Sequence, residues 1–367
     1  MKRKSSNGTE EGQTYWIHPL LRHWAQDSYS DGKSMVLETK KSRLRKLHTN
    51  GYLQAISLVG CGLNTRYDKR EEIEWNYERR NMTHISLCFD TYIPDCDFVT
   101  DEAALNPKVA LALSNFSGLK YYWGENEAWA EMSESAVSLY QRLMRTHENP
   151  PLELETDMLL ANQDLIFVNI FVKRAVDYEL LEGTLSRQRE LLAPDDPRLL
   201  WTESMKASSL YVEGRNEESL EQFKKCLENN AEALDPGHWV SMATINDAAV
   251  LCQEIGDMVS AEELYELSAE LYLKYRGPNH LETHVALQNV AYFRSTCGNY
   301  EGELEYLKIL AKGSEETYGL ANENTMKALK KLEFWYQEHG QDKEQAEVDI
   351  VTLKIEQGRS MLASAED

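Results

Sequence analysis

The sequence has no apolar run of the roughly 18 residues that a membrane-spanning helix needs. Its polar start, MKRKSSNGTEEGQ, contains no apolar stretch of the kind found in secretory signal peptides. The six cysteines include no C-x-x-C pair, so the sequence predicts neither a zinc ribbon nor a thioredoxin-like redox motif. We therefore expect a soluble, cytoplasmic protein with free thiols, in a reducing compartment and without a membrane partner.

Motifs for catalysis and nucleotide binding are missing as well. The chain has no GxxxxGK[ST], no GxGxxG and no GxSxG, so nothing predicts a phosphate-binding loop or a nucleophile elbow. His280 and His284 have the i, i+4 spacing of a zinc site, but the order H-E-x-x-H is not met, and His238 precedes His280 by one repeat. We expect no catalytic residue, no cofactor and no metal. An enzyme on an all-α scaffold is the alternative from a different class.

Charge is strongly one-sided. The chain has 61 acidic and 39 basic residues, a formal net charge of −22, although residues 1–50 hold ten Lys or Arg against five Asp or Glu. The remainder is therefore more acidic still, and an acidic surface repels phosphate backbones. The composition argues against nucleic acid as a partner.

Three residue types recur with a period of 42 residues, and each has a mechanical explanation. Glycines suit the ends of helices, prolines suit the loops between units, and small residues suit close contact between helices. The pattern predicts helices about 16 residues long, such as 240–255, each followed by a second amphipathic helix, such as 260–276. The recurring residues are Gly214, Gly256, Gly298 and Gly340; Pro194, Pro236 and Pro278; and Ala207, Ala249 and Ala291.

The order Ala249, Gly256, Ala261, Tyr265 resembles the tetratricopeptide repeat. The 42-residue spacing and the linkers DPGH (235–238) and GPNHLET (277–283) resemble the kinesin-light-chain type of that family. The resemblance implies an all-α fold, a right-handed superhelix of antiparallel helical hairpins. In the last unit Glu333 and Gln345 replace the small residues, so we expect this unit to act as a cap.

The sequence predicts five segments. Residues 193–360 form four tetratricopeptide-like repeats, and residues 105–192 form two degenerate hairpins, in which Val172 stands at the glycine position and the first pair turns near Gly124. A disordered basic and polar tail (1–13), a winged-helix remnant with a helical lead-in (14–104) and a second tail (361–367) complete the chain.

The segment TYWIHPLLRHWA (14–25) resembles the end of the winged-helix part of fungal NB-ARC/NACHT-type signalling ATPases, and WNYERRNMTHISLC (75–88) resembles their lead into a repeat array. In that family the histidine that matches His18 reaches the phosphate of bound ADP, but Pro19 follows it here where an aspartate is common. The resemblance implies the sensor part of such a protein, with an ATPase domain that is missing from this chain as a partner.

Stacked hairpins form a concave groove lined by the first helix of each unit, and polar and aromatic residues there suit an extended peptide. We therefore predict a non-enzymatic interaction or ligand-sensing module that binds a protein or peptide. The alternative within this class is a free-standing adaptor or scaffold of kinesin-light-chain type. The candidate contact residues are Ser204, Tyr211, Asn246, Gln253, Gln288, Tyr292, Lys330, Phe334 and Gln337.

Overall fold

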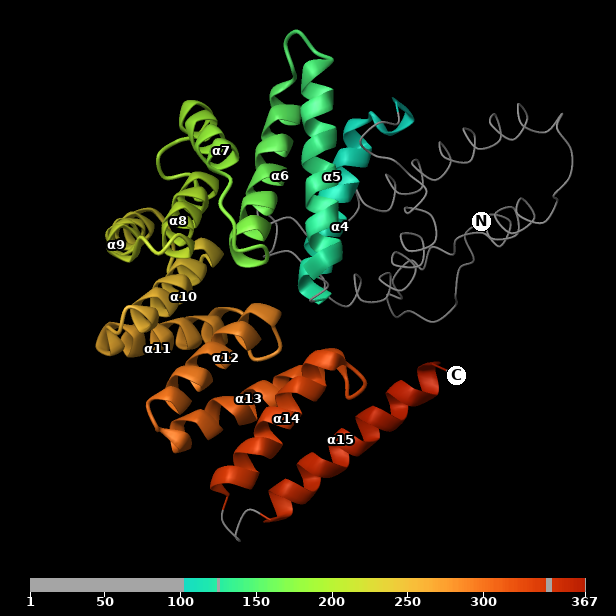
Figure 1. The fold of residues 1–367 in the computed structure, drawn as a ribbon, viewed down its shortest axis with the longest axis vertical. Coiled ribbons are helices and arrows are strands. Elements are labelled where there is room, and N and C mark those ends of the chain that lie inside the picture. Colours follow the sequence, from blue (N-terminus) through green and yellow to red (C-terminus); the bar gives the residue numbers. More distant parts are fainter. Residues whose placement is uncertain (1–101, 124–125, 341–344, 367) are drawn as a thin grey trace, which may run out of the picture. The chain divides into compact units, whose positions relative to one another are not determined.

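The computed structural model describes residues 102–123, 126–340 and 345–366 (Figure 1). In these residues all regular structure is helical, with one short 3-10 helix, η2 (Glu102–Ala104), and twelve α-helices. The predicted segment 1–13 and nearly all of 14–104, including His18, lie outside the described residues. The α-helices are α4 (Pro107–Trp123), α5 (Asn126–Arg145), α6 (Leu152–Phe171), α7 (Tyr178–Leu191), α8 (Pro197–Val212), α9 (Asn216–Ala233), α10 (Trp239–Glu254), α11 (Met258–Tyr275), α12 (Leu281–Thr296), α13 (Tyr300–Tyr318), α14 (Glu323–His339) and α15 (Gln345–Glu366).

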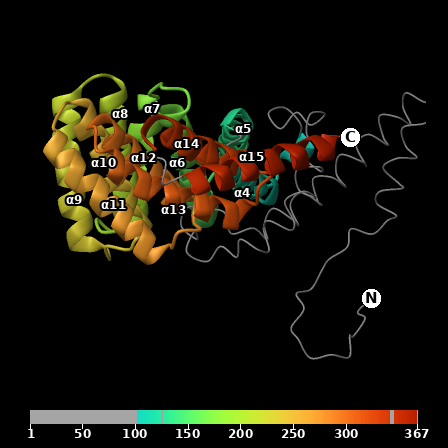
Figure 2. The ribbon, with the colours of Figure 1, turned by 90° about the horizontal axis from the view of Figure 1, so that it is seen from below.

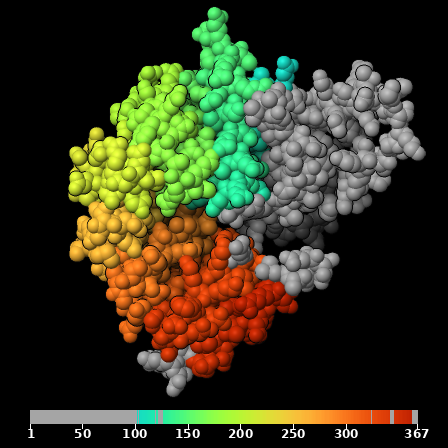
Figure 3. Space-filling view, viewed as in Figure 1, coloured from blue at the N-terminus to red at the C-terminus, as the bar shows by residue number. Residues whose placement is uncertain are grey.

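Consecutive helices pair into six hairpins, from α4–α5 to α14–α15, and each hairpin contacts the next one along the chain. The space-filling view shows the same order, because the colours succeed one another along the surface (Figure 3). The second helix of one hairpin packs on the first helix of the next, as α11 does on α12 and α13 on α14. The predicted all-α stack of helical hairpins is therefore confirmed.

Three of the recurring glycines end a helix in the left-handed conformation. Gly214, Gly256 and Gly298 have φ angles of 76°, 84° and 73°. The residue after each glycine donates a backbone hydrogen bond to a carbonyl five residues earlier, as Asp257 N does to Cys252 O at 2.9 Å. Gly340 differs, because its φ is −65° and its backbone is extended.

The recurring small residues lie where the two helices of a hairpin meet. Ala207, Ala249 and Ala261 are each fully buried. Ser219, the residue of α9 that corresponds to Ala261, donates from Oγ to the carbonyl oxygen of Ala207 at 2.7 Å. The small methyl side chain of alanine allows α9 to approach α8 closely enough for a side chain of α9 to reach the backbone of α8.

The second hairpin ends its first helix without a glycine. Helix α6 has 20 residues and continues to Phe171. The left-handed conformation then falls on Arg174, with φ 52°, two residues after Val172. Ala175 N donates to Asn169 O at 2.9 Å, a closing bond that spans one residue more than those after the glycines. A left-handed non-glycine residue costs about 1–2 kcal/mol, so this turn is less stable than its glycine counterparts.

The second helix of the last hairpin, α15, is shifted by three residues relative to its counterpart α13. A Cβ added to Gly313 would meet the carbonyl oxygen of Pro278, and one added to Gly358 would meet that of Leu320. Pro278 and Leu320 are 42 residues apart, whereas the two glycines are 45 apart. Figure 2 shows α15, the last helix of the stack, beside α14. The helix continues to Glu366, through most of the predicted tail 361–367, because MLASAE contains no helix breaker.

The position of Ala249 allows a stability test. Ala249→Leu adds three heavy atoms where α10 meets α11, so we expect the free energy of unfolding to fall by about 1–3 kcal/mol. Glu263→Leu introduces the same side chain at an exposed position of α11 and should change it by less than about 0.5 kcal/mol. Urea unfolding of both variants measures the difference. Equal effects would show that α10 and α11 do not meet at Ala249.

Candidate functional site

The candidate contact residues lie on the first helices of the last four hairpins. Six of them fall in two repeating registers, whereas Tyr211, Gln253 and Gln337 belong to a third register about one turn further along the helices. Positions 204, 246, 288 and 330 are 42 residues apart, and so are positions 208, 250, 292 and 334. Within each helix the two positions are one turn apart and share a side. We call the surface of α8, α10, α12 and α14 at these eight positions the first-helix face.

Ser204 does not lie at the surface, contrary to the prediction. It is fully buried, its hydroxyl donates to Leu200 O at 3.1 Å, and its Oγ lies 2.8 Å from Thr244 Oγ1 of α10. Asn230 of α9 adds a third polar group, because its Nδ2 donates to Thr244 Oγ1 at 3.0 Å. Ser204 therefore joins neighbouring hairpins and is not available for contact.

Three further candidates are half-buried and partly engaged within the protein. Asn246 Oδ1 accepts a hydrogen bond from Asn289 Nδ2 at 3.0 Å, which links α10 to α12. Gln253 Oε1 accepts from the Tyr265 hydroxyl at 2.8 Å. Tyr211 packs against the core of α8–α10, and burial raises the pKa of its hydroxyl, with a further rise from Glu254.

The remaining candidates are exposed on α12 and α14. Tyr292 and Phe334 expose 64% and 62% of their surface, among the highest values for large apolar residues in the described residues. Gln288 precedes Tyr292 by one turn, and Lys330 precedes Phe334 by one turn. Gln337 is exposed one turn further along α14. The first-helix face is thus buried in α8, intermediate in α10 and open in α12 and α14.

One charged residue beside this face was not predicted. Asp247 of α10 is half-buried as a residue, but protein atoms surround its carboxyl group, and this desolvation raises its pKa to about 7. Hydrogen bonds with Asn246 and Ser208 act in the opposite direction without cancelling the effect. A carboxyl group that titrates near neutral pH therefore lies where α8 and α10 meet. The only signal in the sequence was an aspartate in the middle of a helix whose one other charged residue is Glu254.

The two histidines with zinc-like spacing have structural roles. His280 is the N-cap of α12, and its Nδ1 accepts from the backbone N–H of Glu282 at 3.2 Å. His238 caps α10 in the same way. His284 is buried, its Nε2 lies 2.8 Å from the carbonyl oxygen of Pro278, and burial lowers its pKa. The pair therefore fixes a loop and a helix start, in agreement with its repeat position.

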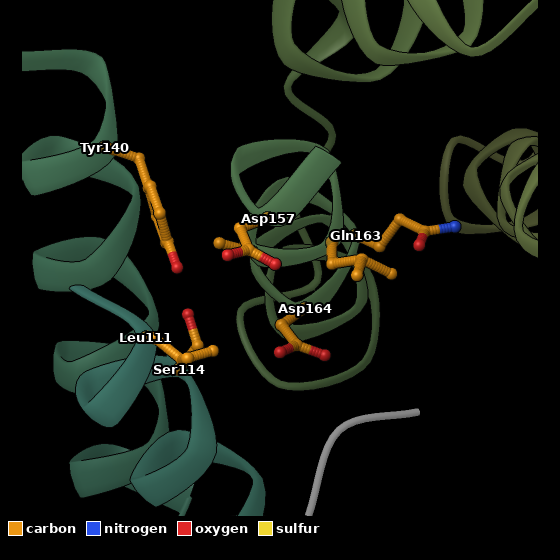
Figure 4. A pocket seen from close by; sticks show the side chains of 8 residues that line it. Leu111, Ser114, Tyr140, Asp157, Gln163 and Asp164 are labelled. Carbon is orange, nitrogen blue, oxygen red and sulfur yellow. The ribbon is translucent and has the colours of Figure 1, made fainter. Parts of the chain in front are cut away.

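A small cavity lies among α4, α5 and α6, and several polar side chains line it. Figure 4 shows the hydroxyl groups of Ser114 and Tyr140 near each other, with Asp157 facing them across the interface. Gln163 points away, and its Nε2 donates to Arg198 O and Thr202 Oγ1 of α8, both at 2.7 Å. The cavity measures about 10 Å³, the space of a single water molecule, and is too small for a substrate.

Comparisons with known proteins give structural neighbours only. No family model and no curated protein matches the sequence. The chain is similar to a crystal structure of the nearly identical TPR-like repeats of a Podosopora anserina protein described as a kinesin light chain. The identity is 20% and the TM-score is 0.43, over 60% of this chain and 99% of that one. A second crystal structure, of a point variant of those repeats, has 19% identity and a TM-score of 0.44 over the same shares. The chain is also similar to BtubC (BKLC) from P. vanneervenii, with 14% identity and a TM-score of 0.48 over 66% of this chain and 92% of that one.

The resemblance to NB-ARC/NACHT proteins and the cytoplasmic location both stay predictions. The resemblance to NB-ARC/NACHT proteins rests on residues outside the described part of the chain. For location, the structure adds one observation, since none of the helices in the described residues is long and apolar enough to cross a membrane.

The raised pKa of Asp247 predicts a pH dependence of stability. The unfolded carboxyl titrates near pH 3.9, so above that value the unfolded state loses its proton while the folded state retains it up to about pH 7. Stability therefore falls as pH rises through this window. Asp247→Asn should remove this loss, so we expect the variant to gain stability over the wild type between about pH 5 and about pH 8 in urea unfolding.

Asp257 provides a control of opposite sign. Hydrogen bonds from Ser260 lower the pKa of this N-cap carboxyl, so its contribution is present above the unfolded pKa and is lost as pH falls. Asp257→Asn should therefore lose stability relative to the wild type at neutral pH. If Asp247→Asn followed the same trend as Asp257→Asn, the carboxyl of Asp247 would not be desolvated.

Proposed function

We propose that this chain is a non-enzymatic binding module that holds a protein or peptide on the first-helix face, chiefly on α12 and α14. The observation that carries the proposal is the repetition of one exposed pair on two successive first helices. Gln288 and Tyr292 on α12 are matched by Lys330 and Phe334 on α14, 42 residues later. Large exposed aromatics beside polar groups are typical of binding surfaces.

The bond between Asn246 and Asn289 shows how these pairs are arranged. It joins the first helices of two neighbouring hairpins through positions 43 residues apart. Moved on by 42 residues, the corresponding positions are Gln288 of α12 and Lys331 of α14. Because Gln288 and Lys331 are exposed, their hydrogen-bonding groups are accessible to the backbone of a bound peptide.

Two biological settings fit such a module. One is the sensor part of an NB-ARC/NACHT-type protein, in which the partner is the ATPase or the ligand that it senses. The other is a free-standing adaptor or scaffold of kinesin-light-chain type. The residues that distinguish them lie within 1–101, outside the described residues, so the proposal concerns the binding surface that both settings share.

A peptide-display selection on the immobilised full chain tests the proposal. Peptides selected on the wild type should bind Tyr292→Ala/Phe334→Ala about tenfold more weakly or worse, because exposed aromatic anchors commonly contribute more than about 1 kcal/mol to binding. The midpoint of thermal unfolding should change little, since both side chains are mostly exposed.

Val259→Ala is the matched control. Val259 of α11 is 71% exposed but belongs to a second helix, outside the first-helix face. Its replacement should leave peptide affinity unchanged. Selected peptides that bind the double variant as tightly as the wild type would contradict the proposed face.

A further inference from the structure

A cleft of about 300 Å³ lies between α7, α8 and α9, apart from the first-helix face. This volume is at the lower end of the range for small-molecule sites. None of the nine candidate contact residues lines it. Its lining comprises Arg189, Leu192, Pro194, Leu199, Leu200, Glu203, Gln222, Lys225 and Asn229.

The cleft combines apolar side chains with a set of polar groups. Leu199 and Leu200 are buried in the core that α6, α7 and α8 share, and Leu192 packs against the same core. Glu203 is the central polar residue: Arg189 Nη2 donates to its Oε1 at 2.5 Å, and Gln222 Nε2 donates to its Oε2 at 3.3 Å.

The next hairpin, α10–α11, has apolar side chains at the corresponding positions. Position 203 becomes Ile245 and then Leu287, and position 222 becomes Leu264 and then Tyr306. Asn229 becomes Leu271, which is buried in one cluster with Ile245 packed against it, and then Gly313. The α8–α9 hairpin therefore differs from its neighbour α10–α11 in having polar residues at all three positions.

The cleft is open to solvent, since Arg189, Lys225 and Asn229 are exposed and Glu203 and Gln222 are half-buried. A concave volume that combines apolar side chains with a few convergent polar groups is the usual form of a small-molecule site. The α10–α11 hairpin, with apolar residues at three of these positions, lacks that combination.

The charges around the cleft select the ligand. Glu203 already accepts from Arg189 and Gln222, so its charge is largely compensated. Lys225 is exposed on α9. Among the lining residues, two cations and one anion leave a net positive charge, in a chain whose net charge is −22.

We propose that the α7–α8–α9 cleft binds a small amphipathic carboxylate, with its apolar body against Leu192, Leu199 and Leu200 and its carboxylate on Lys225. Asn229 lies one turn from Lys225 on α9, so the two side chains project from the same side of that helix, and both line the cleft. The site is independent of peptide binding on the first-helix face, so each can fail without the other.

Hexanoate, hexanol and hexylamine serve as probes, because they share one apolar chain and differ in the head group. Ligand-observed NMR and calorimetry on the full chain should show hexanoate binding most tightly, hexanol more weakly and hexylamine not at all. Absence of hexanoate binding to the wild type, or equal binding of the amine, would overturn the proposal.

Two lysine variants locate the carboxylate. Lys225→Gln should weaken hexanoate about tenfold, equivalent to about 1.4 kcal/mol, without changing hexanol. Lys224→Gln removes a neighbouring exposed lysine of α9 that does not line the cleft, and should leave both affinities as they are. Identical behaviour of the two variants would show that the carboxylate does not reach Lys225.

A triple variant replaces three polar residues of the cleft with the apolar residues that the α10–α11 hairpin has at the same positions. Glu203→Ile, Gln222→Leu and Asn229→Leu together should abolish hexanoate binding and raise the midpoint of thermal unfolding. Retained hexanoate binding would contradict the assignment of the site, and so would a lowered midpoint in a variant that folds. If this variant does not fold, the two lysine variants still decide the question.

Discussion

The hydrogen bond from Ser219 to the carbonyl oxygen of Ala207 measures how closely two helices of this protein approach, and the rest of the structure depends on that approach. A side chain larger than alanine at position 207 would fill the space that the bond crosses. Once the two helices are in contact, their apolar residues form a face that only another hairpin can cover. The stacking of the three hairpins from α8 to α13 therefore depends on the small residues Ala207, Ala249 and Ala291, repeated at a constant interval.

The same 42-residue interval determines which surfaces of the first helices remain exposed for binding. Along the first helices, one register carries Ser204, Asn246, Gln288 and Lys330, and its exposure increases from the first two to the last two. Ser204 and Asn246 are used to join hairpins, whereas Gln288 and Lys330 are not buried by any neighbour in the described part of the chain. A repeat fold does not by itself specify a partner, so binding depends on these exposed side chains and on their aromatic neighbours.

Periodicity predicted the features that depend on the backbone of a single unit. The glycine helix ends, the small residues between helices and the histidine at the start of α12 all lie where the spacing placed them.

Features that depend on two units at once were missed. Ser204 is buried because Thr244 and Asn230 meet it from other helices, and the desolvation of Asp247 has a similar origin. The turn at Arg174 was also missed, because a left-handed arginine leaves no signal in the sequence. The α7–α8–α9 cleft could have been found by comparing positions 203, 245 and 287, since the residue at this repeat position changes from glutamate to isoleucine and leucine. Positions 204, 246, 288 and 330 of the first helices thus belong to the first-helix face. The adjacent positions 203, 245 and 287 face the second helices and, in α8, the cleft.

The polar junction around the cleft has a mechanical consequence. In an array held together only by neighbouring contacts, compliance is greatest where packing density is lowest. The volume beside Glu203 lies against the apolar cluster shared by α6, α7, α8 and α10, because Leu199 and Leu200 belong to both. Under tension or twist, the end of α7 can therefore move relative to α9 with little loss of apolar contact, since polar residues face each other across the cleft. A molecule bound in the cleft would restrict that movement.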